Sequence, residues 1–303
     1  MKHLLTLSEL SESDFEVFLE RAQELRKRQK QGTANRSLVG KTIGLLFDKP
    51  STRTRASFEA AMVQLGGTPL FINSKDTQLS RNEPIKDTSR VLSRYYDGLV
   101  IRTFDQATIE EFARYATVPV INALTDAYHP CQILSDLLTV LQKKRSFENL
   151  KIAWLGDGNN MAHSWINAAA TLGLSLTLAC PQDYFPDQKI LARAQEKNPD
   201  NIKVTTDPIE AVEGADVINT DVWASMGQEG EQETRKAVFE PYQVNAALVK
   251  RAKDDVIVMH CLPAHRDEEI SEEVLEGPNS VVWDQSENKL HMHKAILEIL
   301  LTQ

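Results

Sequence analysis

The chain has 303 residues, of which 42% are hydrophobic and 25% are charged, and its formal net charge is −9. This length exceeds that of most domains with a single core, so we expect two domains of roughly 150 residues each. The apolar content is typical of a globular protein, and the negative charge argues against nucleic acid or an anionic membrane as partner. An acidic protein that binds an anion needs a local group of cations.

Cysteine usage and the N-terminal sequence predict a cytoplasmic protein. Cys131, Cys180 and Cys261 are far apart and show no paired spacing, which is typical of a reducing compartment. The first 23 residues are amphipathic and acidic, unlike a signal or transit peptide. No apolar run approaches the roughly 20 residues that span a bilayer.

From about residue 41, short apolar runs alternate with helical patterns, which predicts parallel sheets flanked by helices. Strands are expected over residues 41–47, 97–103, 118–123, 151–156, 174–180, 215–221 and 255–261. Helices are expected over residues 51–66, 134–144 and 288–301. A second strand–loop–helix start at Lys151 indicates a second α/β domain.

We therefore expect an α/β protein of two domains, each a mainly parallel sheet flanked by helices. The first domain is expected over residues 1–145 and the second over residues 146–287. The apolar spacing of the last helix allows it to pack on either domain, and we assign residues 288–303 to the first.

The strongest chemical signal is the segment DKPSTRTR, residues 48–55, between a buried strand and a helix. Ser51 and Thr52 are good helix N-cap residues, and a helix start offers free N–H groups and positive dipole character. Hydroxyl groups and Arg53 at such an end form a phosphate cradle. The plainer alternative is a capped helix with solvated arginines. The Walker A pattern is absent.

The S-T-R-T-R motif resembles the phosphate motif of the aspartate/ornithine carbamoyltransferase family. Further matches follow in that family's order: Arg102 at a strand end, H-P-C-Q from His129, G-D-G-N-N from Gly156, D-V-W-A-S-M-G from Asp221 and H-C-L-P from His260. The resemblance runs from about residue 40 to the C-terminus, and five motifs in order are not plausible by chance. The S-M-G and H-C-L-P elements are more similar to the ornithine-specific members than to the aspartate-specific ones.

The resemblance implies transfer of a carbamoyl group from carbamoyl phosphate to the side-chain amine of L-ornithine, which gives L-citrulline. This is a step of arginine biosynthesis or, in reverse, of citrulline breakdown, and the residues do not distinguish the two directions. It implies no cofactor, no metal and a homotrimer, with Gln78 lent by a neighbouring subunit. It places carbamoyl phosphate on Ser51, Thr52, Arg53, Thr54, Gln78, Arg102, His129, Gln132, Cys261, Leu262 and Lys289. It places ornithine on Asn160, Asp221, Ser225 and Met226, and it implies catalytic roles for Arg102, His129, Asp221 and Cys261.

The reaction's chemistry agrees with these residue types. Attack by the amine puts negative charge on the former carbonyl oxygen, and departing phosphate gains charge, so both positions need fixed donors. Asp221 suits the α-ammonium of free ornithine, and Asn160 offers a donor and an acceptor to an amino-acid head. Taken alone, Arg102 is an arginine at a strand end, His129 a turn histidine and Cys261 a small buried residue.

Two positions depart from the family pattern. The family usually has arginine after the E-N pair near the C-terminus, whereas this chain has Lys289, a flexible point charge in place of a rigid fork of donors. In the loop over residues 78–84, serine and asparagine replace common glycines. Asn82 can reach the left-handed region, so we expect the turn to survive.

Other readings start from single motifs. The residues around Gly156 and Gly158 resemble a dinucleotide fingerprint, but Met161 holds the third glycine position and Cys180 stands where an acidic residue is expected. His260, Cys261 and His265 suggest a metal site without a fourth ligand, and His291 and His293 point to different helix faces. A carbamoyltransferase for putrescine or acylated ornithine, and a non-catalytic anion-binding homologue, also stay open.

Overall fold

The computed structural model describes residues 1–224, 230 and 232–302. The chain divides into two compact units: unit 1 is Met1–Leu138 with Glu287–Gln303, and unit 2 is Thr139–Ser286. The first segment of unit 1 ends at Leu138, seven residues before the expected domain boundary at residue 145. This end lies within one continuous helix, Pro130–Lys144.

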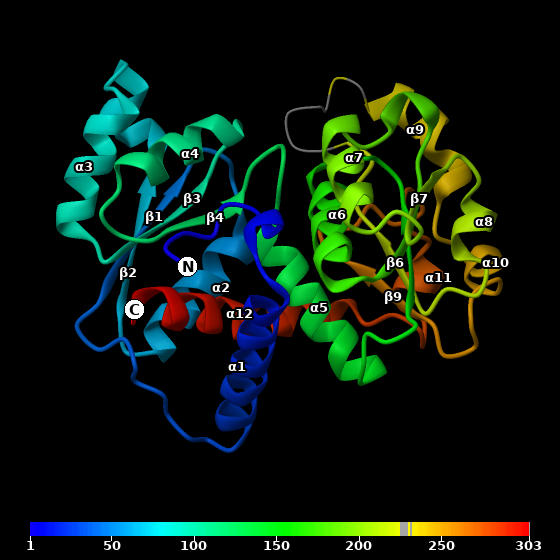
Figure 1. The fold of residues 1–303 in the computed structure, drawn as a ribbon, viewed down its shortest axis with the longest axis horizontal. Helices are drawn as coiled ribbons and strands as arrows, with labels where there is room; N and C mark the ends of the chain where they lie inside the picture. Colours follow the sequence, from blue (N-terminus) through cyan, green and yellow to red (C-terminus); the bar gives the residue numbers. More distant parts are fainter. Residues whose placement is uncertain (225–229, 231, 303) are drawn as a thin grey trace. The chain divides into compact units, whose positions relative to one another are not determined.

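Unit 1 contains a four-stranded sheet in which every strand pairs in parallel with its neighbour (Figure 1). The strand order is β2-β1-β3-β4, so the order reverses between β1 and β3. The strands are β1 (Thr42–Phe47), β2 (Thr68–Asn73), β3 (Gly98–Arg102) and β4 (Val120–Leu124).

Helices connect and cover these strands. They are α1 (Glu12–Lys30), α2 (Thr52–Gln64), α3 (Ile85–Tyr95), α4 (Gln106–Tyr115), α5 (Pro130–Lys144) and α12 (Val282–Leu301), with short 3₁₀ turns η1 (Leu7–Glu9), η2 (Ser74–Asp76) and η3 (Gln78–Arg81). Figure 1 shows α3 and α4 lying together beside the sheet, where Ile109 and Phe112 of α4 pack on Leu99 and Ile101 of β3.

The C-terminal helix α12 packs closely on this sheet. A Cβ atom added to Gly98, the first residue of β3, would lie 2.7 Å from Leu301 Cδ2. Glycine at this position therefore leaves room for the end of α12, which begins at Val282 rather than near residue 288.

Unit 2 contains a five-stranded parallel sheet in the order β7-β6-β5-β8-β9, so its order reverses between β5 and β8. The strands are β5 (Lys151–Leu155), β6 (Ser175–Ala179), β7 (Ile202–Thr205), β8 (Val217–Thr220) and β9 (Ile257–His260). The helices are α6 (Asn160–Leu172), α7 (Gln188–Lys197), α8 (Pro208–Val212), α9 (Gln232–Phe239), α10 (Ala246–Val249) and α11 (Glu272–Leu275), with 3₁₀ turns η4 (Gln182–Tyr184) and η6 (Glu240–Tyr242).

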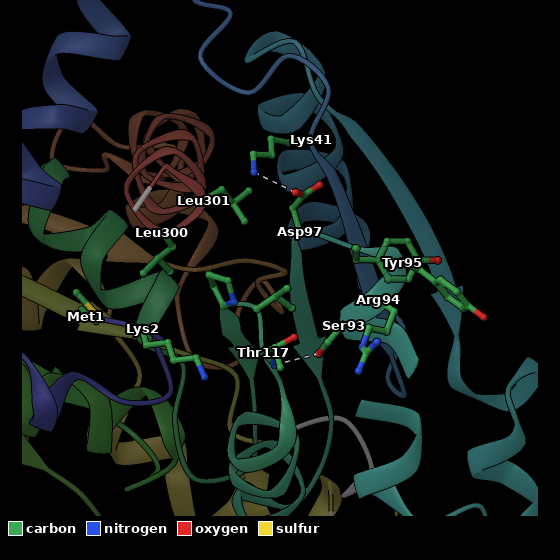
Figure 2. A pocket seen from close by; sticks show the side chains of 13 residues that line it. Met1, Lys2, Lys41, Ser93, Arg94, Tyr95, Asp97, Thr117, Leu300 and Leu301 are labelled. Atoms are coloured by element: carbon green, nitrogen blue, oxygen red, sulfur yellow. Dashed lines mark hydrogen bonds and ion pairs between the residues drawn. The ribbon is translucent and has the colours of Figure 1, made fainter. Parts of the chain in front are cut away.

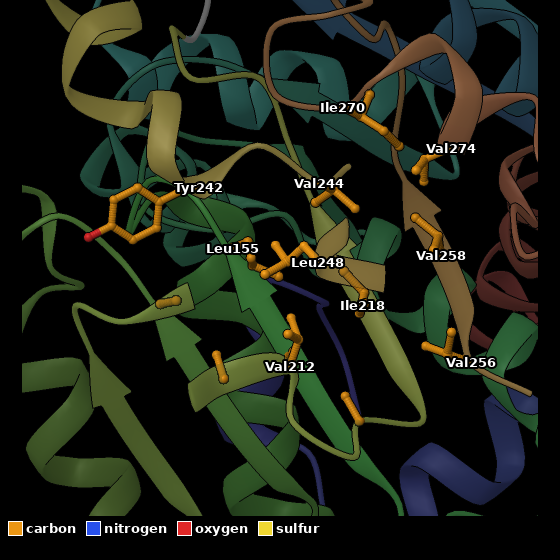
Figure 3. Packing of buried hydrophobic residues seen from close by; sticks show 14 of the residues in the cluster. Leu155, Val212, Ile218, Tyr242, Val244, Leu248, Val256, Val258, Ile270 and Val274 are labelled. Carbon is orange, nitrogen blue, oxygen red and sulfur yellow. The ribbon is translucent and has the colours of Figure 1, made fainter. Parts of the chain in front are cut away.

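One core of unit 2 forms where short helices cover β5, β8 and β9. Figure 3 shows Leu155, Ile218 and Val258 of these strands with Val212 of α8 and Leu248 of α10. Apolar side chains of these strands thus pack against the short helices that cover the sheet.

The two parallel sheets flanked by helices confirm the predicted fold class, and each of the seven expected strands is present within two residues of its expected ends. Sequence patterns missed β2 and β7, which are both edge strands. Strand β2 contains Pro69 and is largely exposed, so it lacks the apolar run of a buried strand. No helix in the described part of the chain is long and apolar enough to cross a membrane.

Burial holds four histidines of unit 1 in the neutral form. Burial lowers the pKa of His3 and of His291 to about 4, and it lowers the pKa of His129 and of His293 well below the ordinary value. In an unfolded chain an imidazole takes up a proton near pH ~6.5. Below that pH the unfolded state therefore binds more protons than the folded state, which lowers the stability of unit 1.

We expect the free energy of unfolding of unit 1 to fall as the pH drops from about 6.5 toward about 4. Hydrogen exchange followed by mass spectrometry, corrected for intrinsic rates, would measure this in peptides of unit 1. Tryptophan fluorescence would not, because Trp154, Trp165, Trp223 and Trp283 all lie in unit 2. The variant His291→Gln should reduce the proton uptake by up to about one proton. Equal protection at pH 7 and pH 5 would contradict this expectation.

Candidate active site

In unit 1 the candidate anion-binding residues follow the two strands between which the strand order reverses. Loops at the carboxyl ends of such strands form the usual ligand crevice of a parallel sheet. The loop after β1 leads into α2, and Ser51 is the N-cap residue of α2 but forms no side-chain capping hydrogen bond. Its hydroxyl group therefore does not cap the N–H groups of the first helical turn, which leaves these groups available to a ligand.

The residues of the first turn of α2 differ in exposure. Thr52 and Arg53 are exposed, whereas the hydroxyl-bearing Thr54 is buried. A hollow of about 620 Å³ adjoins this turn, with Ser51 and Thr52 in its wall. Arg55 also lines this hollow, but it is already paired there, since its Nε donates to Glu59 Oε1 at 2.8 Å and its guanidinium stacks on the Phe71 ring.

Arg102, His129 and Gln132 form a buried group at the same edge of the sheet. Arg102 ends β3, His129 immediately precedes α5, and Gln132 lies in the first turn of α5. Burial, and then the positive charges of Lys289 and Arg102, hold the pKa of His129 well below its ordinary value. His129 is therefore a neutral imidazole beside two cations, so it donates or accepts a hydrogen bond without adding charge.

Lys289 of α12 belongs to this group. It is 6% exposed, and its Nζ donates to Gln132 Oε1 at 2.8 Å. Gln132 Nε2 in turn donates to Asp136 Oδ1 at 2.8 Å. Lys289 stands where the family usually has arginine, and it thus contacts the buried group of Arg102, His129 and Gln132.

Gln78 begins the 3₁₀ turn η3 on the surface of unit 1. Asn82 ends that turn with φ 67° and ψ 26°, which confirms that asparagine adopts the left-handed conformation here. The departure from glycine in this loop therefore leaves the turn intact.

In unit 2 the candidate amino-acid-binding residues also follow the strands at the reversal point. Asn159 and Asn160 follow β5, and Asp221 follows β8. Asn159 Oδ1 caps α6 by accepting from the backbone N–H groups of Met161 and Ala162, while its Nδ2 donates to Asp221 Oδ2 at 3.3 Å. The helix cap thereby fixes the side chain that supports Asp221.

The glycine of the first loop faces the chain's own backbone. A Cβ atom added to Gly158 would lie 2.3 Å from the backbone nitrogen of Pro186 and 2.6 Å from the carbonyl oxygen of Tyr184. In a dinucleotide site this close approach is reserved for the pyrophosphate. The glycine spacing is therefore explained by packing and gives no support to the dinucleotide reading.

Cys261 contacts the same carboxylate. Its Sγ donates to Asp221 Oδ1 at 3.1 Å, and Asp221 is 8% exposed. The two ends of the Asp221 carboxylate are thus held by Cys261 on one side and Asn159 on the other. Leu262, the next residue, has φ 59° and lies in the left-handed region.

A buried pair that the sequence reading missed supports Cys261 and Leu262. His260 Nδ1 accepts from the backbone N–H of Leu262 at 2.8 Å, so its Nε2 carries the proton and donates to Glu269 Oε1 at 3.0 Å. Both side chains are completely buried. A buried glutamate needs a partner, so Glu269 would have indicated the pair if its burial had been known. The spacing of residues in the sequence does not show that burial.

A second missed residue is Arg235 of α9. Its Nη1 donates to Asp157 Oδ2 and to the carbonyl oxygen of Trp223, both at 2.8 Å. Burial raises the pKa of Asp157, and the Arg235 ion pair opposes that rise. Arg235 thereby joins the loops that follow β5 and β8.

The described residues contain two groups of possible metal ligands, Asp221 with His260 and Cys261, and His265 with Glu268 and Glu269, and the donor atoms of each group lie within 4.8 Å of one another. Both ring nitrogens of His260 already form hydrogen bonds, so binding a metal ion through His260 would break one of these bonds. His291 and His293 have different partners, Glu287 and Ser57, as expected for residues two apart on a helix. Ser225 and Met226 lie outside the described residues.

A larger hollow of about 780 Å³ lies at the opposite edge of the sheet of unit 1 (Figure 2). Lys41, Asp97 and Pro119 in its wall immediately precede β1, β3 and β4, so it lies at the amino ends of the strands. None of the predicted site residues that the structure describes lines it.

Comparison with known proteins identifies the family of both parts of the chain. The model of the "aspartate/ornithine carbamoyltransferase, carbamoyl-P binding domain" matches residues 2–142, and that of the corresponding "Asp/Orn binding domain" matches residues 148–300. The chain belongs to the aspartate/ornithine carbamoyltransferase family.

Relatives within this family cover nearly the whole chain. An ornithine carbamoyltransferase from Desulfotalea psychrophila is 58% identical and one from Syntrophus aciditrophicus is 57% identical, each over 99% of both chains. The solved structure of the Pyrococcus furiosus ornithine carbamoyltransferase is similar with a TM-score of 0.96 at 48% identity, over 99% of this chain and 97% of that one.

Proposed function

We propose that the chain transfers the carbamoyl group of carbamoyl phosphate to the side-chain amine of L-ornithine, giving L-citrulline and phosphate. Membership of the carbamoyltransferase family supports the type of reaction. Relatives named ornithine carbamoyltransferase, 57% and 58% identical over 99% of the chain, support the acceptor.

Asp221 is the observation that carries the choice of acceptor. Its carboxylate is almost fully buried, and its hydrogen-bond donors, Asn159 and Cys261, are neutral side chains. Throughout the described part of the chain no cation forms an ion pair with it. A buried carboxylate without a counter-ion is costly, so Asp221 is suited to a cationic ligand such as the α-ammonium of ornithine.

The anion half of the proposed site lies in unit 1. Ser51, Thr52, Arg53 and Thr54 hold the phosphate with hydroxyl groups, a guanidinium and the free N–H groups of α2. A second group, Arg102, His129 and Gln132, holds the carbamoyl moiety, and Lys289 is bound to Gln132 behind it. The fixed donors of this group stabilise the oxyanion that forms when the amine attacks.

The transfer proceeds by one bond exchange. The neutral amine of ornithine attacks the carbonyl carbon, a carbon–nitrogen bond forms, and the carbon–oxygen bond to phosphate breaks with its electron pair on phosphate. The attacking nitrogen loses one proton, which the departing phosphate takes up, and Cys261, hydrogen-bonded to Asp221, assists that loss. Asn160 holds the amino-acid head, as do Ser225 and Met226, while Leu262 lies beside the reacting amine.

We expect Arg53→Ala to lose well over ~2 kcal/mol of transition-state stabilisation, the order observed when a pre-organised donor to developing charge is removed. The measurement is kcat/KM for carbamoyl phosphate in a citrulline assay. Arg55→Ala is the matched control, two residues along the same helix. It should lose less, because Arg55 contacts Glu59 and Phe71. Near-normal turnover of Arg53→Ala at saturating carbamoyl phosphate would refute the phosphate assignment.

We expect ornithine to exceed putrescine and acetylornithine by at least ~100-fold in kcat/KM, the order set by one or two lost polar pairings. Putrescine lacks the carboxylate, and acylated ornithine lacks the ammonium that Asp221 needs. The measurement is a side-by-side carbamoylation assay with four amines, the fourth being aspartate. Aspartate would need further cations in the site for its second carboxylate. A preference for any of the other three amines would replace the acceptor and leave carbamoyl transfer intact.

The proposed enzyme is a cytoplasmic homotrimer that needs no cofactor. The three cysteines are free thiols, which suits a reducing compartment. The resemblance assigns Gln78 to the active site of a neighbouring subunit, and its exposed position in unit 1 leaves it accessible to such a partner.

We expect sedimentation at assay concentration to give a trimer or a multiple of a trimer. Gln78→Ala should then lower turnover without changing the mass of the assembly. A fully active monomer would refute the shared site.

A further inference from the structure

Helix α12 directs two buried side chains toward the proposed carbamoyl phosphate site. Lys289 and His293 are four residues apart, so they lie on the same helix face. Their exposed fractions are 6% and 0%. Each side chain contacts a different helix of the proposed site. Lys289 contacts Gln132 of α5, and His293 contacts Ser57 of α2.

Lys289 determines which way the Gln132 carboxamide points. The Gln132 oxygen accepts from the Lys289 ammonium and the Gln132 nitrogen donates to Asp136, both at 2.8 Å. If the amide were reversed, its N–H₂ would face an ammonium and its oxygen would face a carboxylate. The carboxamide therefore presents to a ligand one defined lone pair and one defined N–H.

His293 acts on α2 through Ser57. Its Nδ1 lies 2.9 Å from Ser57 Oγ, and that oxygen lies 2.7 Å from the carbonyl oxygen of Arg53 and 3.1 Å from that of Thr54. A hydroxyl group has one proton to donate. Ser57 meets all these contacts when it donates to the carbonyl groups and accepts from a His293 ring protonated at Nδ1.

The imidazole ring is also held by packing. His293 stacks on Phe58 with 3.6 Å between ring centroids and 12° between planes. Burial, and then the charge of Lys289, lowers the pKa of His293 well below its ordinary value, so the ring is neutral. A neutral ring has a single N–H, and the contacts of Ser57 place it on Nδ1.

We infer that Lys289 and His293 are positioning residues for carbamoyl phosphate, Lys289 by orienting Gln132 and His293 by fixing the first turn of α2 through Ser57. This inference rests on the proposed function, because it takes Gln132, Arg53 and Thr54 as ligands of that substrate. It joins the two groups of anion ligands through one helix face, and it gives the lysine that replaces the family's arginine a role of its own.

The first test compares His293→Phe with His293→Asn. Phenylalanine keeps the ring stack on Phe58 and removes the donor, whereas asparagine keeps a donor near the position of Nδ1 and removes the ring. If His293 acts through Ser57, His293→Phe raises KM for carbamoyl phosphate by about 10-fold or more, as for a lost hydrogen bond in a buried site, and His293→Asn restores most of it. A purely structural role predicts the reverse order, and that result would overturn the inference for His293.

The second test is a double-mutant cycle on Lys289 and Gln132. Lys289→Met removes the donor at similar length, and we expect KM for carbamoyl phosphate to rise about 10- to 100-fold with KM for ornithine within about 3-fold. In a Gln132→Ala background the same change should add little, since Lys289 acts through Gln132. Full additivity would show that Lys289 contacts the substrate directly and would overturn the positioning role.

Calorimetric binding of carbamoyl phosphate to each variant separates this inference from the proposed function, because binding needs no turnover. The control is His291→Gln on another face of α12, which should leave both KM values unchanged. If the wild type binds carbamoyl phosphate but forms no citrulline, the proposed reaction fails and the binding cycles still decide the inference. A wild type that does not bind carbamoyl phosphate overturns both.

Discussion

The chemistry of both units depends on one constraint of parallel sheets, which is that all strands end at the same edge. Where the strand order reverses, the two adjacent strands send their connections to opposite faces and leave a crevice between the loops. In unit 1 these strands are β1 and β3, and in unit 2 they are β5 and β8. Buried strands hold the starts of these loops, so the fold itself positions the candidate site residues.

The constraint also explains how a protein with net charge −9 forms an anion site. Cations collect at one strand edge of unit 1, where Arg102 and Lys289 are buried beside His129. A third charge in that space would be repelled, and burial of His129 in neutral form avoids it. In the proposed phosphate site the exposed Arg53 and the N–H groups of α2 supply positive charge without burying a further ion.

Much of this arrangement was predictable from sequence, because buried strands and helix starts have strong local signals. The seven expected strands are apolar runs, and Ser51 was identified as an N-cap by its position after one of them. The missed strands β2 and β7 are edge strands that need no continuous apolar run. The roles of Glu269 and Arg235 were also missed, since their partners His260, Asp157 and Trp223 lie 9, 78 and 12 residues away and are set by tertiary packing.

Two buried carboxylates of unit 2 show how the same side chain serves different purposes. Asp157 has its own counter-ion, Arg235, at 2.8 Å, so it stabilises the loops and needs no ligand. Asp221 receives hydrogen bonds from neutral groups that offset only part of the cost of burying its charge. We propose that a bound cation recovers the remainder, which links the affinity of the proposed site to the charge of the ligand. An acceptor with a free α-ammonium satisfies Asp221, and an acylated one would leave the carboxylate both buried and unpaired.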